Sequence, residues 1–165
     1  MTLRIAAALS ALALAACATT PPGAAHPEAR AYAVGADAKA DVEAALARVG
    51  ASGKRVLLVL GADWCHDSRA LAGWLATPRF AALLAARYEV VFVDVGMPQM
   101  GEGRNLDVPR RFGLADMKGT PALLVLTPEG TPVNLDTAAS WRNAASRDED
   151  AIFAELARLA DTPAP

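Results

Sequence analysis

An apolar run that ends in glycine and leads into a cysteine constrains the fold of this chain more than any other feature. Residues 56–60 (VLLVL) carry no charge and include two β-branched valines, and Gly61 follows them. A run this short fits a strand buried on both faces better than a helix. Leu71, Trp74 and Leu75 then recur at helical spacing. The pattern therefore predicts a buried strand, a short turn and a helix, with Cys65 at the start of that helix.

The predicted position of Cys65 favours a reactive thiol. The first turn of a helix carries unpaired N–H groups and the positive end of the macrodipole, which favour a negative charge, and the thiolate is the reactive form of cysteine. Arg69 lies one turn further along and adds to this effect, whereas Asp63 and Asp67 oppose it. The Ser68 hydroxyl is also one turn away, within reach of a thiolate on the same face. The alternative is an inert buried thiol, which is a common state of free cysteine.

Two motifs in order resemble the signature of the thioredoxin superfamily. The first is Trp64-Cys65 at the start of the predicted helix, and the second is Thr120-Pro121 directly before another apolar run at residues 122–126. The resemblance covers roughly residues 37–160. It implies an α/β fold, namely a three-layer α/β/α domain with a mixed central sheet, and a cis peptide bond at Thr120–Pro121 beside Cys65. It also implies the following roles: Cys65, Ser68 and Pro121 form the catalytic site, and Trp64, His66 and Thr120 contact the substrate.

The chain departs from the superfamily pattern at two positions. Ser68 stands where the second cysteine belongs, and a hydroxyl cannot resolve a mixed disulfide. The buried acid of the superfamily would fall on Val59, and Asp63 is the nearest substitute. Two hypotheses follow. The chain is a monothiol redox protein that acts on protein or small-molecule disulfides, or it is a redox-inactive module that binds extended peptides in a groove between Cys65 and Pro121.

Neither a metal ion, a cofactor nor a nucleic acid is expected as a partner. Cys65, His66 and Asp67 are adjacent, and three neighbouring residues rarely close a tetrahedral metal site. The only other histidine, His26, falls outside the predicted domain. The formal net charge is −2 and the sequence contains no basic block, which argues against nucleic-acid binding.

The first 16 residues have the pattern of a secretory signal peptide. Arg4 is followed by an uncharged stretch at residues 5–16, which is shorter than the roughly 20 apolar residues that a membrane-spanning helix needs. Residues 14–17 (LAAC) resemble the lipobox of bacterial lipoproteins, in which cleavage leaves the cysteine first and a lipid on its sulfur. Cys17 is then a membrane anchor. The alternative is an ordinary signal peptide in which Cys17 has no role.

The lipobox resemblance also implies a location and leaves Cys65 without a partner in the chain. Ala18 follows Cys17, which implies sorting to the outer membrane of a Gram-negative cell envelope, with the domain facing the periplasm. The sequence contains only these two cysteines. Once Cys17 carries lipid, Cys65 can form a disulfide only with another molecule.

The rest of the chain predicts one domain between a tether and a short tail. Residues 17–36 are rich in proline and alanine and are expected to be a flexible tether; residues 37–161 form the domain and 162–165 the tail. The first half of the domain is expected to contain a helix capped by Asp37 or Asp41 and running to residue 49, the strand at 56–60, the Cys65 helix, a helix at 79–87 and a strand at 89–95. A loop at 96–107 and a helical turn at 109–113 follow. The second half contains strands at 122–126 and 132–135 that form a hairpin, an irregular stretch at 137–147, and a helix capped by Asp148.

Overall fold

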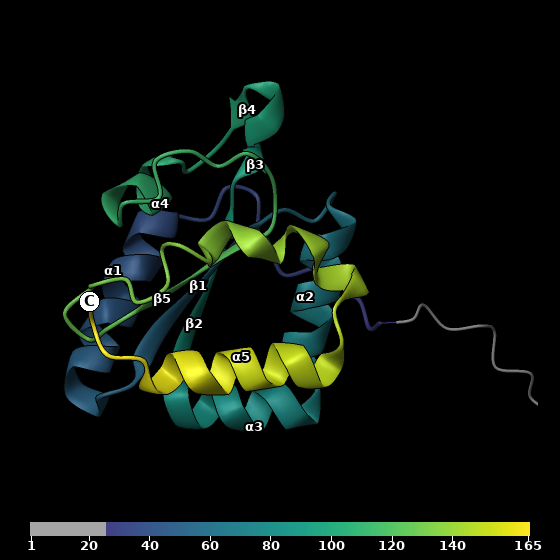
Figure 1. Cartoon of the computed structure of the whole chain (residues 1–165). Helices are drawn as coiled ribbons and strands as arrows, with labels where there is room; N and C mark the ends of the chain where they lie inside the picture. Colours follow the sequence, from purple (N-terminus) through teal and green to yellow (C-terminus); the bar gives the residue numbers. More distant parts are fainter. Residues whose placement is uncertain (1–25) are drawn as a thin grey trace, which may run out of the picture.

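A computed structural model describes residues 26–165, and its elements follow the predicted order (Figure 1). The helices are α1 (Ala38–Ser52), α2 (His66–Ala76), α3 (Pro78–Arg87), α4 (Asp107–Arg111) and α5 (Glu149–Asp161), with 3-10 turns η1 (Pro98–Met100) and η2 (Ala138–Ser146). The strands are β1 (Arg55–Gly61), β2 (Tyr88–Asp94), β3 (Gly96–Met97), β4 (Glu102–Gly103) and β5 (Ala122–Leu126). No helix among these residues is both long and apolar enough to cross a bilayer.

The main sheet has β1 at its centre, in the order β2-β1-β5. β1 pairs in parallel with β2 and antiparallel with β5, so that Leu58 lies opposite Val91 on one side and Leu124 on the other. The parallel pair is joined through α2 and α3, because two parallel strands need a long connection. The predicted mixed sheet is therefore confirmed.

The two faces of β1 belong to two separate cores, which makes the fold three-layered. Leu57 and Val59 pack under α2, α3 and α5, whereas Leu58 and Leu60 face α1 and α4. All four side chains are fully buried, as expected for a strand covered on both sides. In Figure 1, α3 and α5 lie side by side on one face of the sheet and α1 on the other.

The helix ends carry the caps that the sequence indicates. The Asp37 side chain accepts a hydrogen bond from Ala40 N, which identifies Asp37 rather than Asp41 as the cap of α1. Asp148 caps α5 by accepting from the N–H groups of Asp150 and Ala151. Residues 138–146, expected to be irregular, instead form the helical turns of η2, because the fully buried Trp141 and Ala144 pack in the α2 side of the core.

The outer edge of β5 is closed by a side chain instead of a strand. The expected strand at residues 132–135 is reduced to a single bridge between Leu126 and Pro132. The buried Asn134 amide takes the place of the next strand: its Oδ1 accepts from Val125 N at 2.8 Å, and its Nδ2 donates to Leu123 O at 3.0 Å. Pro132 has no N–H to donate to a ladder. The chain therefore turns back antiparallel to β5, as the predicted hairpin requires, but the predicted second strand at residues 132–135 does not form.

A small two-stranded insertion, β3 with β4, replaces the loop expected at residues 96–107 and projects from the top of the domain in Figure 1. Its base is fixed by Asp94, a buried carboxylate at the end of β2. Asp94 Oδ2 accepts from Arg104 Nε at 2.8 Å, and Oδ1 accepts from Gly96 N at 3.2 Å. The insertion is thus anchored at the edge of the sheet where Cys65 also lies, since Asp94 pairs in register with Gly61.

Residues 26–36 were expected to belong to the tether, but they pack on the domain. Tyr32 is buried in the core below α2, with its ring edge-to-face with Phe92 at 5.4 Å. The N–H groups of Ala31 and Tyr32 both donate to the carboxylate of Asp63. The N–H of Ala29 also donates to Arg69 O at 3.0 Å, which ties the segment to α2. The domain therefore begins before residue 37, while the predicted signal peptide, Cys17 and the tether up to residue 25 lie outside the described residues.

Candidate active site

Cys65 is the N-cap residue of α2, as the strand–turn–helix pattern predicts. Its main-chain O accepts from Arg69 N at 3.0 Å, and its N–H donates to Ala62 O at 3.0 Å. These two bonds fix the turn between β1 and α2. The residue is 8% exposed, and its Sγ–H donates to Thr120 O at 3.4 Å.

The partner of the Cys65 thiol lies on a cis peptide bond. Thr120–Pro121 is cis, which confirms the prediction. The bond directly precedes β5, and the pairing of Ala122 with Leu60 brings the end of this strand to the end of β1. Two motifs 55 residues apart therefore meet at one edge of the sheet. Thr120 is buried, and its Oγ1 has no hydrogen-bond partner within residues 26–165.

The Ser68 hydroxyl faces β1 rather than the thiol. Ser68 is fully buried, and its Oγ accepts from Ala62 N at 3.4 Å. The hydrogen bond expected between this hydroxyl and the Cys65 sulfur is not among the bonds of the described residues. Gly61 explains the close approach of α2, because a Cβ at this position would lie 2.7 Å from Ser68 Oγ.

Trp64 connects the cysteine turn to the insertion. The residue is 48% exposed, and its Nε1 donates to Gly96 O at 3.1 Å. The next turn of the site is held by Arg69, whose guanidinium donates to the carbonyls of Asp63 and Trp64. The expected support of a thiolate by Arg69 thus rests on its charge, since Nε and Nη1 donate to Glu28, Asp63 and Trp64 and no hydrogen bond to the Cys65 sulfur occurs among the described residues.

The place of the superfamily's acid is apolar, as the sequence indicates. Val59 is fully buried in the core. Asp63, the nearest substitute, uses one carboxylate oxygen to hold the main chain of residues 31 and 32. Sequence reasoning missed the buried acid at this edge of the sheet, Asp94; an aspartate that ends a β-branched strand just before Val95-Gly96 was the available signal. Asp94 is paired with Arg104, so we assign it to the insertion and not to the thiol.

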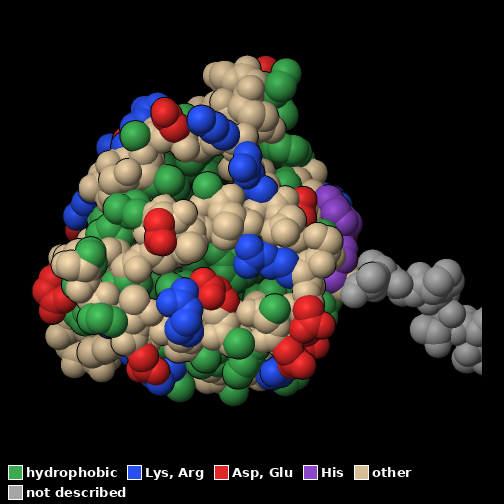
Figure 2. Space-filling model, viewed as in Figure 1, with side chains coloured by type: hydrophobic (Ala, Val, Ile, Leu, Met, Phe, Trp, Pro, Cys, Tyr) green, Lys and Arg blue, Asp and Glu red, His purple; other side chains and the backbone are tan. Residues whose placement is uncertain are grey.

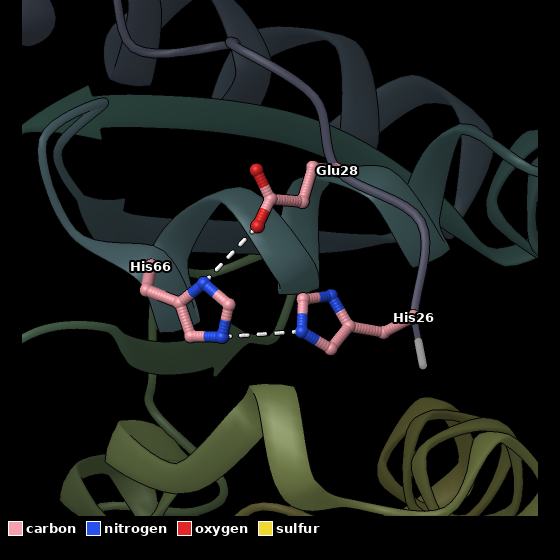
Figure 3. A group of neighbouring side chains, drawn as sticks. All are labelled: His26, Glu28 and His66. Carbon is pink, nitrogen blue, oxygen red and sulfur yellow. Dashed lines mark hydrogen bonds and ion pairs between the residues drawn. The ribbon is translucent and has the colours of Figure 1, made fainter. Parts of the chain in front are cut away.

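Sequence reasoning also missed a cluster beside Cys65 that consists of His26, Glu28 and His66 (Figure 3). His66 begins α2, and its Nδ1 lies 3.0 Å from Glu28 Oε1. His66 Nε2 lies 3.2 Å from His26 Nε2, with the ring centroids 4.7 Å apart. The two imidazoles form one patch on the surface in Figure 2. The premise that His66 has no second histidine within the domain was therefore wrong.

The electrostatics of this cluster involve Arg69 as well. The second oxygen of Glu28 accepts from Arg69 Nε at 3.0 Å. This hydrogen bond is the main reason why the pKa of the Glu28 carboxyl lies below its usual value, and the charges of Arg69 and His66 act in the same direction. Glu28 is therefore an ionised carboxylate that links the N-terminal segment to α2 through two residues, His66 and Arg69.

Comparison with known proteins agrees with this geometry. A family model described as thioredoxin-like matches residues 37–128. Among solved structures, the disulphide isomerase from Xylella fastidiosa Temecula1 is 32% identical, with a TM-score of 0.72 over 81% of this chain and 98% of that one. A thioredoxin from Thermus thermophilus is 24% identical, with a TM-score of 0.51 over 72% of this chain and 83% of that one, and it supports the fold alone. The comparison with curated proteins gives no match.

Proposed function

Because the chain belongs to the thioredoxin-like family, we propose that it is a thiol–disulfide exchange protein in which Cys65 is the single nucleophile. The observation that carries the proposal is the position of the Cys65 sulfur, which lies at the N-terminus of α2 and 3.4 Å from the carbonyl before the cis-proline. The similar protein named as a disulphide isomerase supports the same class of chemistry.

The proposed reaction begins with the Cys65 thiolate. It attacks one sulfur of a substrate disulfide, so that a mixed disulfide with Cys65 forms, the substrate S–S bond breaks, and the leaving sulfur departs as a thiolate that takes up a proton. A second thiol must then attack the mixed disulfide and release Cys65. Ser68 offers no sulfur for this step. The second thiol comes from the substrate itself, which amounts to isomerisation, or from an external small thiol. In the latter case the substrate is left in a mixed disulfide with the small thiol, and a second small thiol completes the reduction and leaves as the small-molecule disulfide.

The Thr120 carbonyl gives the site a means of holding substrate only after attack. In the resting state it accepts the thiol hydrogen of Cys65. Once Cys65 is bonded to a substrate sulfur, that hydrogen is gone and the carbonyl can accept an N–H from an extended substrate chain. We propose that Thr120 contacts the substrate in this way, that Pro121 shapes the turn, and that the exposed Trp64 and His66 form the outer contacts.

Disulfide shuffling in a scrambled small protein, with reduced glutathione present or absent, tests this mechanism. The wild type should isomerise the substrate, and without glutathione it should accumulate a mixed disulfide at Cys65 that mass spectrometry detects. Ser68→Cys should speed release of that intermediate, whereas Ser52→Cys, which adds a thiol at the exposed end of α1, should not. Cys65→Ser should abolish exchange. Exchange that persists in Cys65→Ser would refute the role of this thiol.

A second candidate is a redox-inactive module that binds extended peptides beside Cys65 and Pro121. The observation that favours it is the state of Ser68: its hydroxyl is buried and hydrogen-bonded to the main chain, and residue 68 provides no second sulfur to resolve a mixed disulfide. Peptide binding measured by fluorescence anisotropy separates the two candidates. A module should bind equally well with Cys65→Ser, whereas an enzyme should retain peptide through a bond that a reductant breaks.

We also propose that the protein acts at the cell envelope, anchored through lipid on Cys17 and facing the periplasm, most simply at the outer membrane. The support is the short apolar signal and the residues 14–17 that end in cysteine. Intact-mass analysis of the membrane fraction should show a diacylglycerol-modified Cys17 as the first residue. Cys17→Ala should move the protein out of that fraction, and a wild-type product that is soluble and begins at another residue would contradict the anchor.

A further inference from the structure

The hydrogen bonds around the two histidines leave the Nε2 lone pairs facing each other. His26 Nδ1 lies 3.3 Å from Pro27 O, and His66 Nδ1 lies 3.0 Å from the Glu28 carboxylate. A carbonyl and a carboxylate only accept, so both Nδ1 atoms carry a hydrogen. In a neutral imidazole the other nitrogen then holds a lone pair. The two Nε2 atoms, 3.2 Å apart, therefore need one hydrogen or one cation between them.

That separation matches the spacing of two ligands on one metal ion. Nitrogen ligands at about 2.0–2.1 Å from a tetrahedral cation lie about 3.3 Å from each other. We propose that His26 and His66 bind a divalent cation of the zinc type through their Nε2 atoms. The proposal does not depend on the chemistry of Cys65.

Glu28 has the place of an outer-sphere carboxylate in this site. A histidine that ligates a metal usually donates its other N–H to a carboxylate, which fixes the ring and raises its basicity. Glu28 does this for His66, and Arg69 holds its second oxygen at 3.0 Å. The His26, Glu28 and His66 ligand atoms all lie within 4.8 Å of one another, the one such group of histidine, cysteine and acidic residues within residues 26–165.

The site is built in advance by the packing of the N-terminal segment on α2. His26 is only 8% exposed, because Pro27 lies directly over Gly73 of α2, where a Cβ would be 2.4 Å from the Pro27 main chain. The His66 side chain is 58% exposed, so a cation can enter from solvent and complete its shell with water. Two imidazoles favour zinc, copper, nickel or cobalt over magnesium or calcium.

The neighbouring thiol is directed away from this cluster. The Cys65 sulfur donates to Thr120 O, and it is not a member of the group of converging ligand atoms. A thiolate is nevertheless a strong zinc ligand. The experiment must therefore separate imidazole binding from sulfur binding.

Zinc titration of the full-length chain with Cys17→Ser and Cys65→Ser tests the site, with a chromophoric chelator as competitor. One Zn²⁺ per chain should bind, and Mg²⁺ should not compete. His26→Gln and His66→Gln should each weaken binding at least tenfold, and Glu28→Gln by about 10- to 100-fold. Glu43→Gln removes a carboxylate from another ion pair, with Arg111, and should change nothing.

Two further readouts keep the test decisive. The exposed His66→Gln variant should unfold at the same temperature as its parent without zinc, so that lost binding cannot reflect lost folding. Cobalt bound to a chain that retains Cys65 should show visible d–d bands without a thiolate-to-cobalt band in the near ultraviolet. Unchanged zinc affinity in either histidine variant, no zinc binding by the parent, or a thiolate band that depends on Cys65 would each overturn the proposal.

Discussion

Replacing Gly73 with alanine tests whether the N-terminal segment is part of the domain. A Cβ at Gly73 would lie 2.4 Å from both C and O of Pro27 and 2.6 Å from Glu28 N, all main-chain atoms that cannot rotate away. Gly50 provides a matched control. It also lies within a helix, α1, and a Cβ there would have no heavy atom within 4 Å.

The magnitude follows from two opposing terms. Alanine stabilises a helix interior by about 0.5–1 kcal/mol relative to glycine, so Gly50→Ala should gain about this amount. At Gly73 the built contacts fall about 1 Å short of ordinary van der Waals distance, and inserting a methyl group into such a tight contact costs about 1–3 kcal/mol. Gly73→Ala should therefore be less stable than Gly50→Ala by about 1–3 kcal/mol.

Chemical denaturation monitored by tryptophan fluorescence measures this difference, with both variants compared at equal m-values. In a chain of this size 1 kcal/mol corresponds to about 2–4 °C in Tm, so thermal unfolding provides a second measurement. The reasoning is refuted if Gly73→Ala gains as much stability as Gly50→Ala. In that case residues 27 and 28 do not lie on α2, and the segment is the tether that its composition suggests.

Three further predictions concern stability. Tyr32→Ala should cost about 3–5 kcal/mol in the free energy of unfolding because it empties a core position, whereas Tyr32→Phe should cost under about 1 kcal/mol because its hydroxyl bond to Ser68 O is long, at 3.5 Å; equal losses in denaturant melts would contradict this. Asn134→Ala should cost about 1–3 kcal/mol by leaving two β5 main-chain groups unpaired, and an unchanged denaturation midpoint would count against it. Lys39 lowers the pKa of Asp107, so its contribution is present above the ordinary carboxyl pKa and is lost as pH falls through the lowered value. The stability difference between wild type and Lys39→Gln should thus vanish in acid, and its persistence there would contradict the pairing.

The central part of the fold and site could be predicted from the sequence because its signals are local. The run at 56–60 is apolar at every position, and only a strand covered on both faces requires that. Cys65 follows it at a helix start, and Pro121 precedes a second run of the same kind. Each of these features can be recognised from a few consecutive residues, and the pairing of β1 with β5 then brings Cys65 and Pro121 together.

The N-terminal segment could not be predicted, because its position is determined by residues far from it in the sequence. Tyr32 is an isolated aromatic among prolines and alanines, and the acceptor for its N–H is Asp63, which lies 31 residues further along the chain. His26 has a partner only because α2 begins at residue 66 and Gly73 admits Pro27. Such contacts leave no periodic pattern, so composition alone suggested a flexible tether.

The amide of Asn134 determines how the sheet can meet other molecules. An edge strand with free main-chain groups is a template on which another extended chain can add, including a second copy of the protein. On β5, the outward carbonyl of Leu123 and both main-chain groups of Val125 are already engaged by Asn134 and Val133. Strand addition, and the aggregation that it permits, is therefore blocked at this edge. A further strand would also have covered β5, but it would have exposed a new edge of its own.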